Sequence, residues 1–130
     1  MLILTIRTDK PDAELGLFDH AIKLAYSKWP AHRRLAETIH SKIKELLESQ
    51  NRGLADLDAV AVFKGPGSFT GLRIGISVAN TLADSLGLPI VSETGDDWIE
   101  KACLRLEKGA DERIALPEYG AEPKTTKPRK

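Results

Sequence analysis

The chain has 130 residues, of which 42% are apolar and 29% charged, a composition typical of a globular protein with one core. Its 19 basic residues balance its 19 acidic residues, so net charge gives no argument for nucleic acid or a membrane surface as a partner. The single cysteine, Cys103, excludes an internal disulfide and a cysteine-rich metal site, and no apolar run approaches the roughly 20 residues of a membrane span.

The first 30 residues predict three strands in succession. A mostly apolar, strand-forming run covers positions 2–6, turn-forming residues follow at 7–12, and a second strand pattern covers 14–18. From Ile22 to Tyr26 apolar and polar residues alternate, which is typical of a strand with one buried face. We therefore expect an antiparallel meander. Because the strand pattern begins without a basic segment or a cleavage site, we also expect a cytoplasmic protein.

The rest of the chain alternates helices with apolar strands. A one-sided amphipathic helix is predicted from Pro30 to about Ser49, with its apolar stripe on Leu35, Ile39, Ile43 and Leu46. A strand that is apolar on both faces follows at 57–63, then a helix at 70–86, a strand at 88–91 and a helix at 97–108. After Gly109 the pattern is lost, and Pro, Lys and Glu become frequent, which predicts a flexible tail over 110–130.

The element order β-β-β-α-β-α-β-α is that of a ribonuclease H-like lobe. Proteins of the actin-like ATPase superfamily are built from two such lobes, whereas this chain has room for one. We therefore predict an α/β fold with a five-stranded mixed sheet, in a single lobe at residues 1–109.

A glycine-rich turn opens the second predicted helix. Gly65 and Gly67 flank Pro66 where a left-handed backbone is expected, and Ser68 or Thr70 is placed to cap the helix. A glycine-rich turn at a helix N-terminus is also a ready anion site. However, this turn lacks the Gly-Lys-Ser/Thr of a P-loop and the spacing of a dinucleotide fingerprint, and Pro66 removes one amide donor. We therefore read the turn as structural and expect no cofactor.

The second predicted helix has more apolar surface than a sheet can cover. Its polar residues crowd into a narrow arc, while apolar and small residues fill roughly 200°, against about 100° needed for packing on a sheet. Gly71 and Gly75 lie on one face, where they permit close approach of another backbone. Phe69 lies in a turn that should be solvated. Its aromatic ring is therefore expected to be covered, either by a partner or by the core of this chain. The second neighbour is either the first helix of this chain or another subunit.

The stretch from Gly65 to Gly75, GPGSFTGLRIG, resembles the signature of the TsaB (YeaZ) family. The resemblance is close over about residues 54–92, including Asp56-Leu57-Asp58 and Leu86-Gly87-Leu88-Pro89, and is weaker toward the N-terminus. Two positions depart from the family pattern. Arg7-Thr8-Asp9 stands where the family has an Asp-Thr-Ser turn, and Leu35 stands where it tends to have a histidine. The second lobe normal in the family is not expected here.

The resemblance implies a non-catalytic subunit that binds TsaD, its catalytic paralogue, in making threonylcarbamoyladenosine on tRNA. A TsaE-like ATPase joins that complex, tRNA is contacted only indirectly, and the free subunit is expected to be a homodimer. Family pairings use the first two helices, so the resemblance favours an interface on both. We expect it to involve Leu35, Ile39, Ile43, Phe69, Gly71, Leu72, Gly75, Val78, Ala79 and Leu82.

Two alternatives stay open. One is a nucleotide- or phosphate-binding enzyme of the actin-like superfamily that completes its cleft by dimerising, and the other is a stand-alone homodimer that has lost the modification role. The sequence presents no catalytic constellation, because His20, His32 and His40 are scattered over predicted surface positions and Cys103 falls within a helix. We therefore expect neither catalytic nor metal-binding residues.

Overall fold

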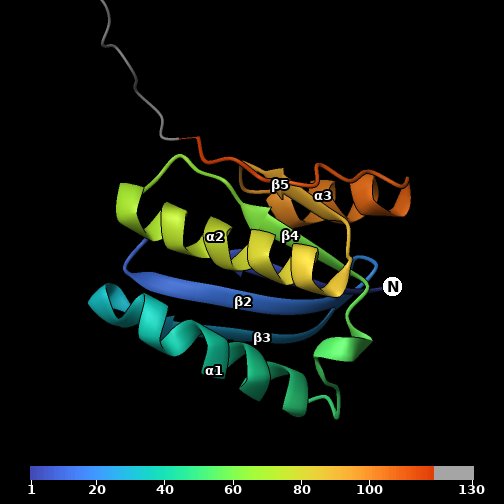
Figure 1. Ribbon diagram of the computed structural model, residues 1–130, viewed down its shortest axis with the longest axis horizontal. Helices are drawn as coiled ribbons and strands as arrows, with labels where there is room; N and C mark the ends of the chain where they lie inside the picture. The colour runs from blue at the N-terminus through green and yellow to red at the C-terminus, as the bar shows by residue number, and fades with distance from the viewer. Residues whose placement is uncertain (119–130) are drawn as a thin grey trace, which may run out of the picture.

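A computed structural model of the protein describes residues 1–118, which form one five-stranded sheet with helices on both of its faces (Figure 1). The strand order is β3-β2-β1-β4-β5. The bounds are β1 Leu2–Arg7, β2 Asp12–Asp19, β3 Ile22–Pro30, β4 Ala59–Phe63 and β5 Ile90–Glu93. The first three strands pair antiparallel, while β4 lies parallel to both β1 and β5. The predicted mixed sheet and element order are therefore confirmed.

Strand β4 lies between β1 and β5 and is buried on both of its faces. All five of its residues are buried, as the absence of polar residues from this run predicts. It pairs with β1 on one side, Leu4 opposite Val60, and with β5 on the other, Val60 opposite Ile90. The ring of Phe63 packs edge-on against Trp98, with ring centroids 5.7 Å apart.

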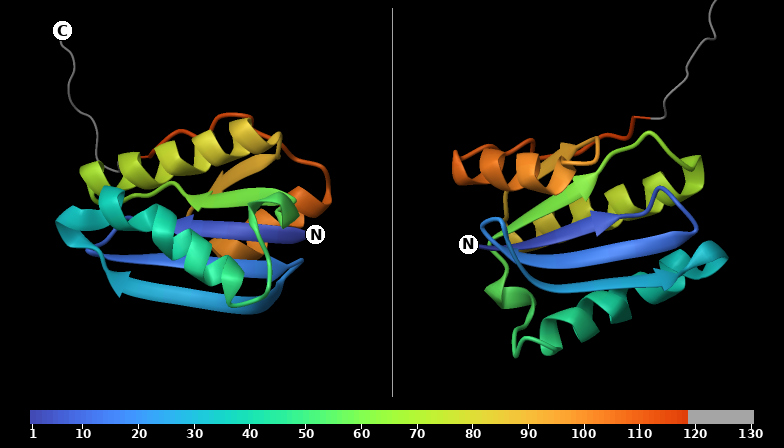
Figure 2. Two further views of the ribbon diagram at one scale, coloured as in Figure 1. Left: turned by 60° about the horizontal axis from the view of Figure 1, so that its bottom comes forward. Right: turned by 180° about the vertical axis from the view of Figure 1, so that it is seen from behind.

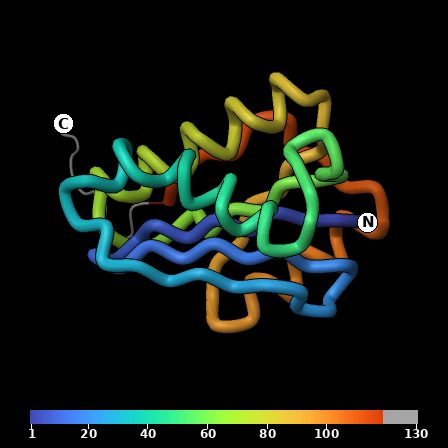
Figure 3. Tube along the Cα trace, turned by 90° about the horizontal axis from the view of Figure 1, so that it is seen from below, coloured from blue at the N-terminus to red at the C-terminus, as the bar shows by residue number. Residues whose placement is uncertain are grey.

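The helices form two layers, one on each side of the sheet. Helices α1 (Leu35–Glu48) and α2 (Phe69–Leu86) cover one face, and α3 (Trp98–Glu107) covers the other (Figures 2 and 3). The predicted apolar stripe of α1 is confirmed, since Leu35, Ile39, Ile43, Leu46 and Leu47 are all buried. Among the helices in residues 1–118, none has both the length and the apolar character to cross a membrane.

The main boundary difference lies between β3 and α1. We predicted that Pro30 begins the helix, but Pro30 ends β3, pairing with Asp12. A 3₁₀ turn at His32–Arg34 then leads into α1 at Leu35. The strand continues because Trp29 is buried and its indole N–H donates to Thr38 Oγ1 at 3.1 Å. Tertiary packing thus outweighs the helix-start preference of proline.

Residues 110–118 contain no helix or strand, yet they are held firmly against the domain. The Glu112 N–H donates a hydrogen bond to the carbonyl of Ile90. The side-chain amide of Asn80 both donates to the carbonyl of Ala115 and accepts from its N–H. The Glu118 N–H donates to the carbonyl of Lys64 at 2.7 Å. Ala115 is buried in the core. The packed unit therefore extends beyond the boundary predicted at residue 109; residues 119–130 of the predicted tail lie outside the described residues.

A polar cluster fastens this segment to the edge of β5. Glu112 accepts hydrogen bonds from the amide and hydroxyl of Ser92, at 2.9 and 2.7 Å, and from Arg105 at 2.9 Å. Burial acts to raise the pKa of Glu112, but these hydrogen bonds favour its charged form more strongly, so the pKa lies below its ordinary value. The carboxylate thereby satisfies an edge amide that would otherwise be open to another strand.

Candidate protein-binding groove between helices α1 and α2

Helices α1 and α2 lie on the same face of the sheet and both begin at the same end of it (Figure 2). Each buries one stripe on the sheet, and between them their outer side chains leave an open groove. Three adjoining hollows, of about 350, 480 and 460 Å³, make up this groove. His40 lines both the first and the second hollow, while Thr70 and Ile74 line both the second and the third. We call the three together the α1–α2 groove.

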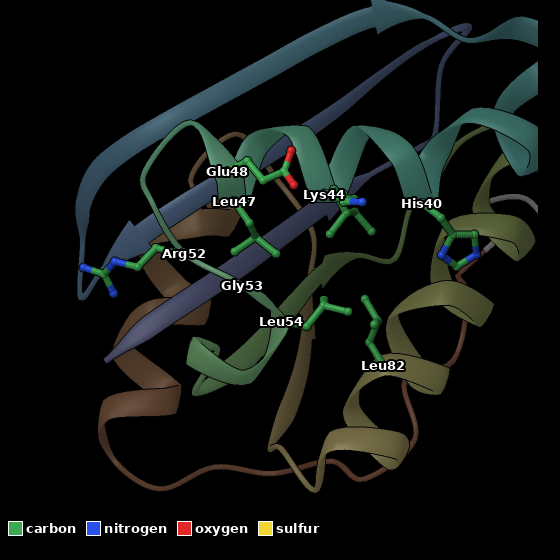
Figure 4. A pocket seen from close by; sticks show the side chains of 9 residues that line it. His40, Lys44, Leu47, Glu48, Arg52, Gly53, Leu54 and Leu82 are labelled. Carbon is green, nitrogen blue, oxygen red and sulfur yellow. The ribbon is translucent and has the colours of Figure 1, made fainter.

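The end of the α1–α2 groove nearest the helix C-termini is apolar inside and charged at its rim. Leu47, Leu54 and Leu82 point into the same space from α1, the following loop and α2 (Figure 4). Lys44, Glu48 and Arg52 lie around them. Leu54 is 44% exposed, so this end presents apolar surface to solvent.

Most of the residues predicted to form an interface belong to the core instead. Six of them pack into the sheet with at most 9% exposure, namely Leu35, Ile39, Ile43, Leu72, Val78 and Ala79. Leu35, Ile43 and Val78 still reach the groove as part of its floor. Leu82 is half-buried and lines the groove, and Phe69, the first residue of α2, is 55% exposed beside the Arg73 guanidinium.

The close approach expected at Gly71 and Gly75 is made within the chain. A Cβ on Gly71 would collide with the carbonyl oxygen of Thr8, and one on Gly75 would collide with the Thr8 hydroxyl. The Thr8 hydroxyl also donates to the carbonyl of Gly71 at 2.7 Å. Thr8, in the turn directly after β1, therefore lies against these two glycines, in place of the helix of another subunit that we predicted.

The glycine-rich turn is also fastened to the turn after β1. Gly65 has a φ of +117°, as expected, whereas Gly67 is required because a Cβ there would collide with Asp9. The Ser68 N–H donates to the carbonyl of Asp9 at 3.0 Å, and Ser68 Oγ caps the helix by accepting from Gly71 N–H at 3.3 Å. Of the two predicted caps, Ser68 therefore caps α2, while Thr70 lines the groove.

Arg7 and Asp9 occupy the turn where the sequence departs from the family pattern. They form a two-point ion pair, with Arg7 Nε 2.8 Å from Asp9 Oδ1 and Nη2 3.1 Å from Oδ2. The hydrogen bond to Asp9 raises the pKa of Arg7. The guanidinium also stacks over Phe63, 4.0 Å from the ring centroid. The turn is thus tied internally by opposite charges.

The remaining chemically active residues do not converge on a site. Within residues 1–118 no group of three or more His, Cys, Asp and Glu side chains is arranged to hold a metal ion. Cys103 is buried on α3, where burial raises the pKa of its thiol to about 11. His20 contacts Glu107, whereas His32 and His40 lie along the α1–α2 groove.

Sequence reasoning missed several residues that shape the groove. Ala36, His40, Ile74 and Ser77 line its middle part, although none was in the predicted interface. The helical spacing of these residues could have identified them. Ala36 and His40 lie one turn apart beside the buried stripe of α1, and Ile74 and Ser77 lie one turn apart beside that of α2. The groove-lining positions lie beside the apolar stripe rather than on it.

Comparison with known proteins identifies relatives of this lobe. A family model described as TsaD, tRNA N6-adenosine threonylcarbamoyltransferase, matches residues 30–95, about half of the chain. The tRNA threonylcarbamoyladenosine biosynthesis protein TsaB of Haemophilus influenzae is 38% identical over 102 residues, which cover 74% of this chain and 43% of that protein. A tRNA N6-adenosine threonylcarbamoyltransferase of Geotalea uraniireducens is 43% identical over 76 residues, covering 58% of this chain and 21% of that protein.

A solved structure resembles this chain as well. YeaZ from Pseudomonas aeruginosa superposes with a TM-score of 0.66 at 28% identity, over 72% of this chain and 43% of that one. This likeness agrees with the predicted ribonuclease H-like fold. The chain spans less than half the length of each of these relatives.

Proposed function

The chain belongs to the TsaB (YeaZ) family of tRNA threonylcarbamoyladenosine biosynthesis proteins, and on this premise we propose that it is a non-catalytic subunit that binds a TsaD-like catalytic subunit. Docking occurs along the α1–α2 groove. The subunit contributes by holding its partner in an active arrangement, and the chemistry belongs to the partner. A TsaE-like ATPase in the complex and a homodimer of the free chain remain predictions from the family resemblance.

The observation that carries this proposal is the continuous α1–α2 groove. Both of its helices fall within residues 30–95, the segment that matches the family model. Its hollows, of about 350 to 480 Å³, run one into the next through shared lining residues. An apolar groove of this kind, rimmed by polar side chains, is typical of a surface that accepts a helix from a partner.

The internal bonding of the glycine-rich turn supports a role without nucleotide chemistry. The amides of Ser68, Gly71 and Leu72 already donate within the chain, to the Asp9 carbonyl, the Ser68 hydroxyl and the Ser68 carbonyl. A phosphate cradle needs such amides directed at the ligand. In this chain the end of β1 takes up that space instead.

Co-purification with the TsaD-like protein of the same genome tests the proposal. The variant Ser77→Trp places a bulky side chain in the middle of the groove, and Ser41→Trp is its matched control on an exposed part of α1 that does not line the groove. We expect the wild-type chain and Ser41→Trp to form the complex, and Ser77→Trp to lose it while keeping its melting temperature. A wild-type chain that does not associate, or equal binding by both variants, contradicts the proposal.

A further inference from the structure

The two edges of the sheet are finished in different ways. At the β5 edge, the outward-facing backbone groups are bonded within the chain. The N–H of Ile90 donates to Asp111 Oδ1 at 3.2 Å, and its carbonyl accepts from the Glu112 N–H at 2.8 Å. The N–H of Ser92 donates to Glu112 Oε2 at 2.9 Å, and its carbonyl accepts from Arg105 Nη1 at 3.0 Å. This edge is therefore closed to another strand.

The β3 edge, which lies beside α1, has no such closure (Figure 1). Strand β3 is 9 residues long, against 4 in β5. Because β3 pairs antiparallel with β2, alternate residues direct their N–H and carbonyl groups away from the sheet. Within residues 1–118, no side chain or loop hydrogen-bonds the outward backbone of residues 22–28. We infer that this edge accepts, as an added strand, an extended segment of a partner protein in which acidic and apolar residues alternate. This inference does not depend on the proposed function.

One face of β3 is basic. A bulge at Leu24, where the register with β2 shifts, puts Lys23, Tyr26 and Lys28 on the same face. The Lys23 ammonium accordingly lies 5.5 Å from the centroid of the Tyr26 ring. Trp29 is on the opposite face, buried under α1. The basic face is therefore turned away from α1, on the side of the sheet where α3 packs on β4 and β5.

The charges of this face are available to an added strand. Neither Lys23 nor Lys28 forms an ion pair within residues 1–118. Glu14 lies opposite Lys28 on β2, where it accepts a hydrogen bond from the Tyr26 hydroxyl at 2.6 Å. A strand added at the outer edge of β3 lies directly against both lysines. Acidic side chains on the same face of that strand would pair with them across the two strands.

The other face of β3 fits apolar side chains. Ile22 is 68% exposed on this face, and Ala25 and Ser27 are small and half-buried beside it. Since successive residues of a strand point to opposite faces, a segment that pairs with β3 would present acidic and apolar residues in turn. Backbone pairing supplies affinity in this mode of recognition, and the alternate side chains supply specificity.

The lysines disfavour a second copy of this chain at this edge. Two-fold antiparallel pairing about Tyr26 would set Lys28 of each copy opposite the bulge at Lys23 and Leu24 of the other. Like charges directly opposite each other destabilise a strand pair, and lysines on edge strands commonly act against such pairing. The discrimination concerns the β3 edge alone, and the homodimer predicted through the helices does not use this edge.

Binding of synthetic strands to the full chain tests the inference. The probe is a fluorescent peptide of about nine residues, matching β3, in which glutamate and valine alternate. Its counterpart has lysine at each glutamate position. Anisotropy measures affinity, while amide NMR shifts and hydrogen exchange locate the peptide. We expect the glutamate peptide to bind at least about tenfold more tightly than the lysine peptide, with slower exchange at alternate amides of β3.

Two methylated peptides test for backbone pairing. Each carries N-methyl groups on one of the two alternate sets of amides in the glutamate peptide. Only one set can face β3, so one peptide should lose binding and the other should keep it within about threefold. Equal binding by both, or equal loss, overturns the added-strand geometry.

Matched charge reversals separate the β3 edge from general electrostatics. Lys23→Glu with Lys28→Glu should weaken the glutamate peptide by about tenfold or more. Lys108→Glu with Arg113→Glu, at exposed positions after α3, makes the same change in net charge and should leave affinity within about twofold. A wild-type chain that ignores the glutamate peptide, equal loss in the control, shifts confined to the α1–α2 groove, or tighter binding of an unmodified tRNA transcript at the β3 amides overturns the inference.

Discussion

The two sides of α2 behave differently although both carry small and apolar residues. The side with Gly71 and Gly75 is filled by Thr8, directly after β1, which leaves no room for even one added carbon. The side with Ile74 and Ser77 opens into the α1–α2 groove. A surplus of apolar surface on a helix therefore indicates that something packs against it, but not which chain supplies the packing atoms. A turn of the same chain can cover this surface as well as a partner protein can.

The closed side of α2 should be the most sensitive to substitution. Gly75→Ala should destabilise the fold by about 2–4 kcal/mol, because the collision with Thr8 outweighs the gain of about 1 kcal/mol in helix propensity. Thr8→Ala in the same chain should restore part of the loss, since the collision is with the Thr8 side chain. Urea unfolding of the single and double variants measures the coupling.

Gly71→Ala is the matched control for this rescue. Its new carbon meets the backbone carbonyl of Thr8, which no substitution at Thr8 removes. We expect a loss of similar size, about 2–4 kcal/mol, that Thr8→Ala does not relieve. Rescue of neither variant would show that the Thr8 side chain does not close the space beside Gly75, and rescue of both would contradict the backbone collision at Gly71.

A third side of α2 faces residues 110–118 and should show an intermediate effect. Asn80→Ala removes both hydrogen bonds to Ala115, at 3.0 and 2.8 Å, and leaves that backbone unpaired beside the core. We expect a loss of about 1–3 kcal/mol in unfolding free energy and faster hydrogen exchange at Ala115. Unchanged exchange would mean that the segment is held from β5 rather than from α2.

The attachment at β5 should depend on pH. The lowered pKa of Glu112 means that its charged form stabilises the fold above the ordinary carboxyl pKa, and that this contribution is lost as pH falls through the lowered folded-state pKa. Glu112→Gln should therefore cost about 1 kcal/mol near pH 7, and the difference from the wild-type chain should be lost at an acid pH below the lowered folded-state pKa. Unfolding curves at both pH values check this, and a difference that persists in acid would contradict it.

Substitutions on the open side of α2 should have the smallest effect on stability. Ser77 is exposed and lines the groove, so Ser77→Ala should alter the unfolding free energy by less than about 0.5 kcal/mol. A thermal melt beside that of Gly75→Ala makes the comparison direct. A clear loss from Ser77→Ala would mean that this side is also packed within the chain.

Local sequence patterns predicted much of the fold correctly. The stripe of α1 and the all-apolar run of β4 fix which faces are buried, and both are confirmed. The alternation over 22–26 predicted a strand correctly but not its buried face, since Ile22 is 68% exposed and Tyr26 39% exposed on an edge strand of the sheet. The errors fall where distant residues compete with local preference. Pro30 suits the start of a helix, but Trp29 packing against Thr38 keeps it in a strand. Similarly, the polar composition after Gly109 hides the contacts of Glu112 and Ala115.

For the candidate site, the sequence by itself determined the family signature, the two helices and a cap at either Ser68 or Thr70, because these depend on residues close together in the chain. Only the tertiary structure decided what lies against each side of α2. Thr8 is 63 residues from Gly71, and no periodicity in either segment encodes their contact. The α1–α2 groove arises in the same way, because residues that line it, such as Lys10, Arg33, Arg52 and Arg73, come from separate segments that only the fold brings together.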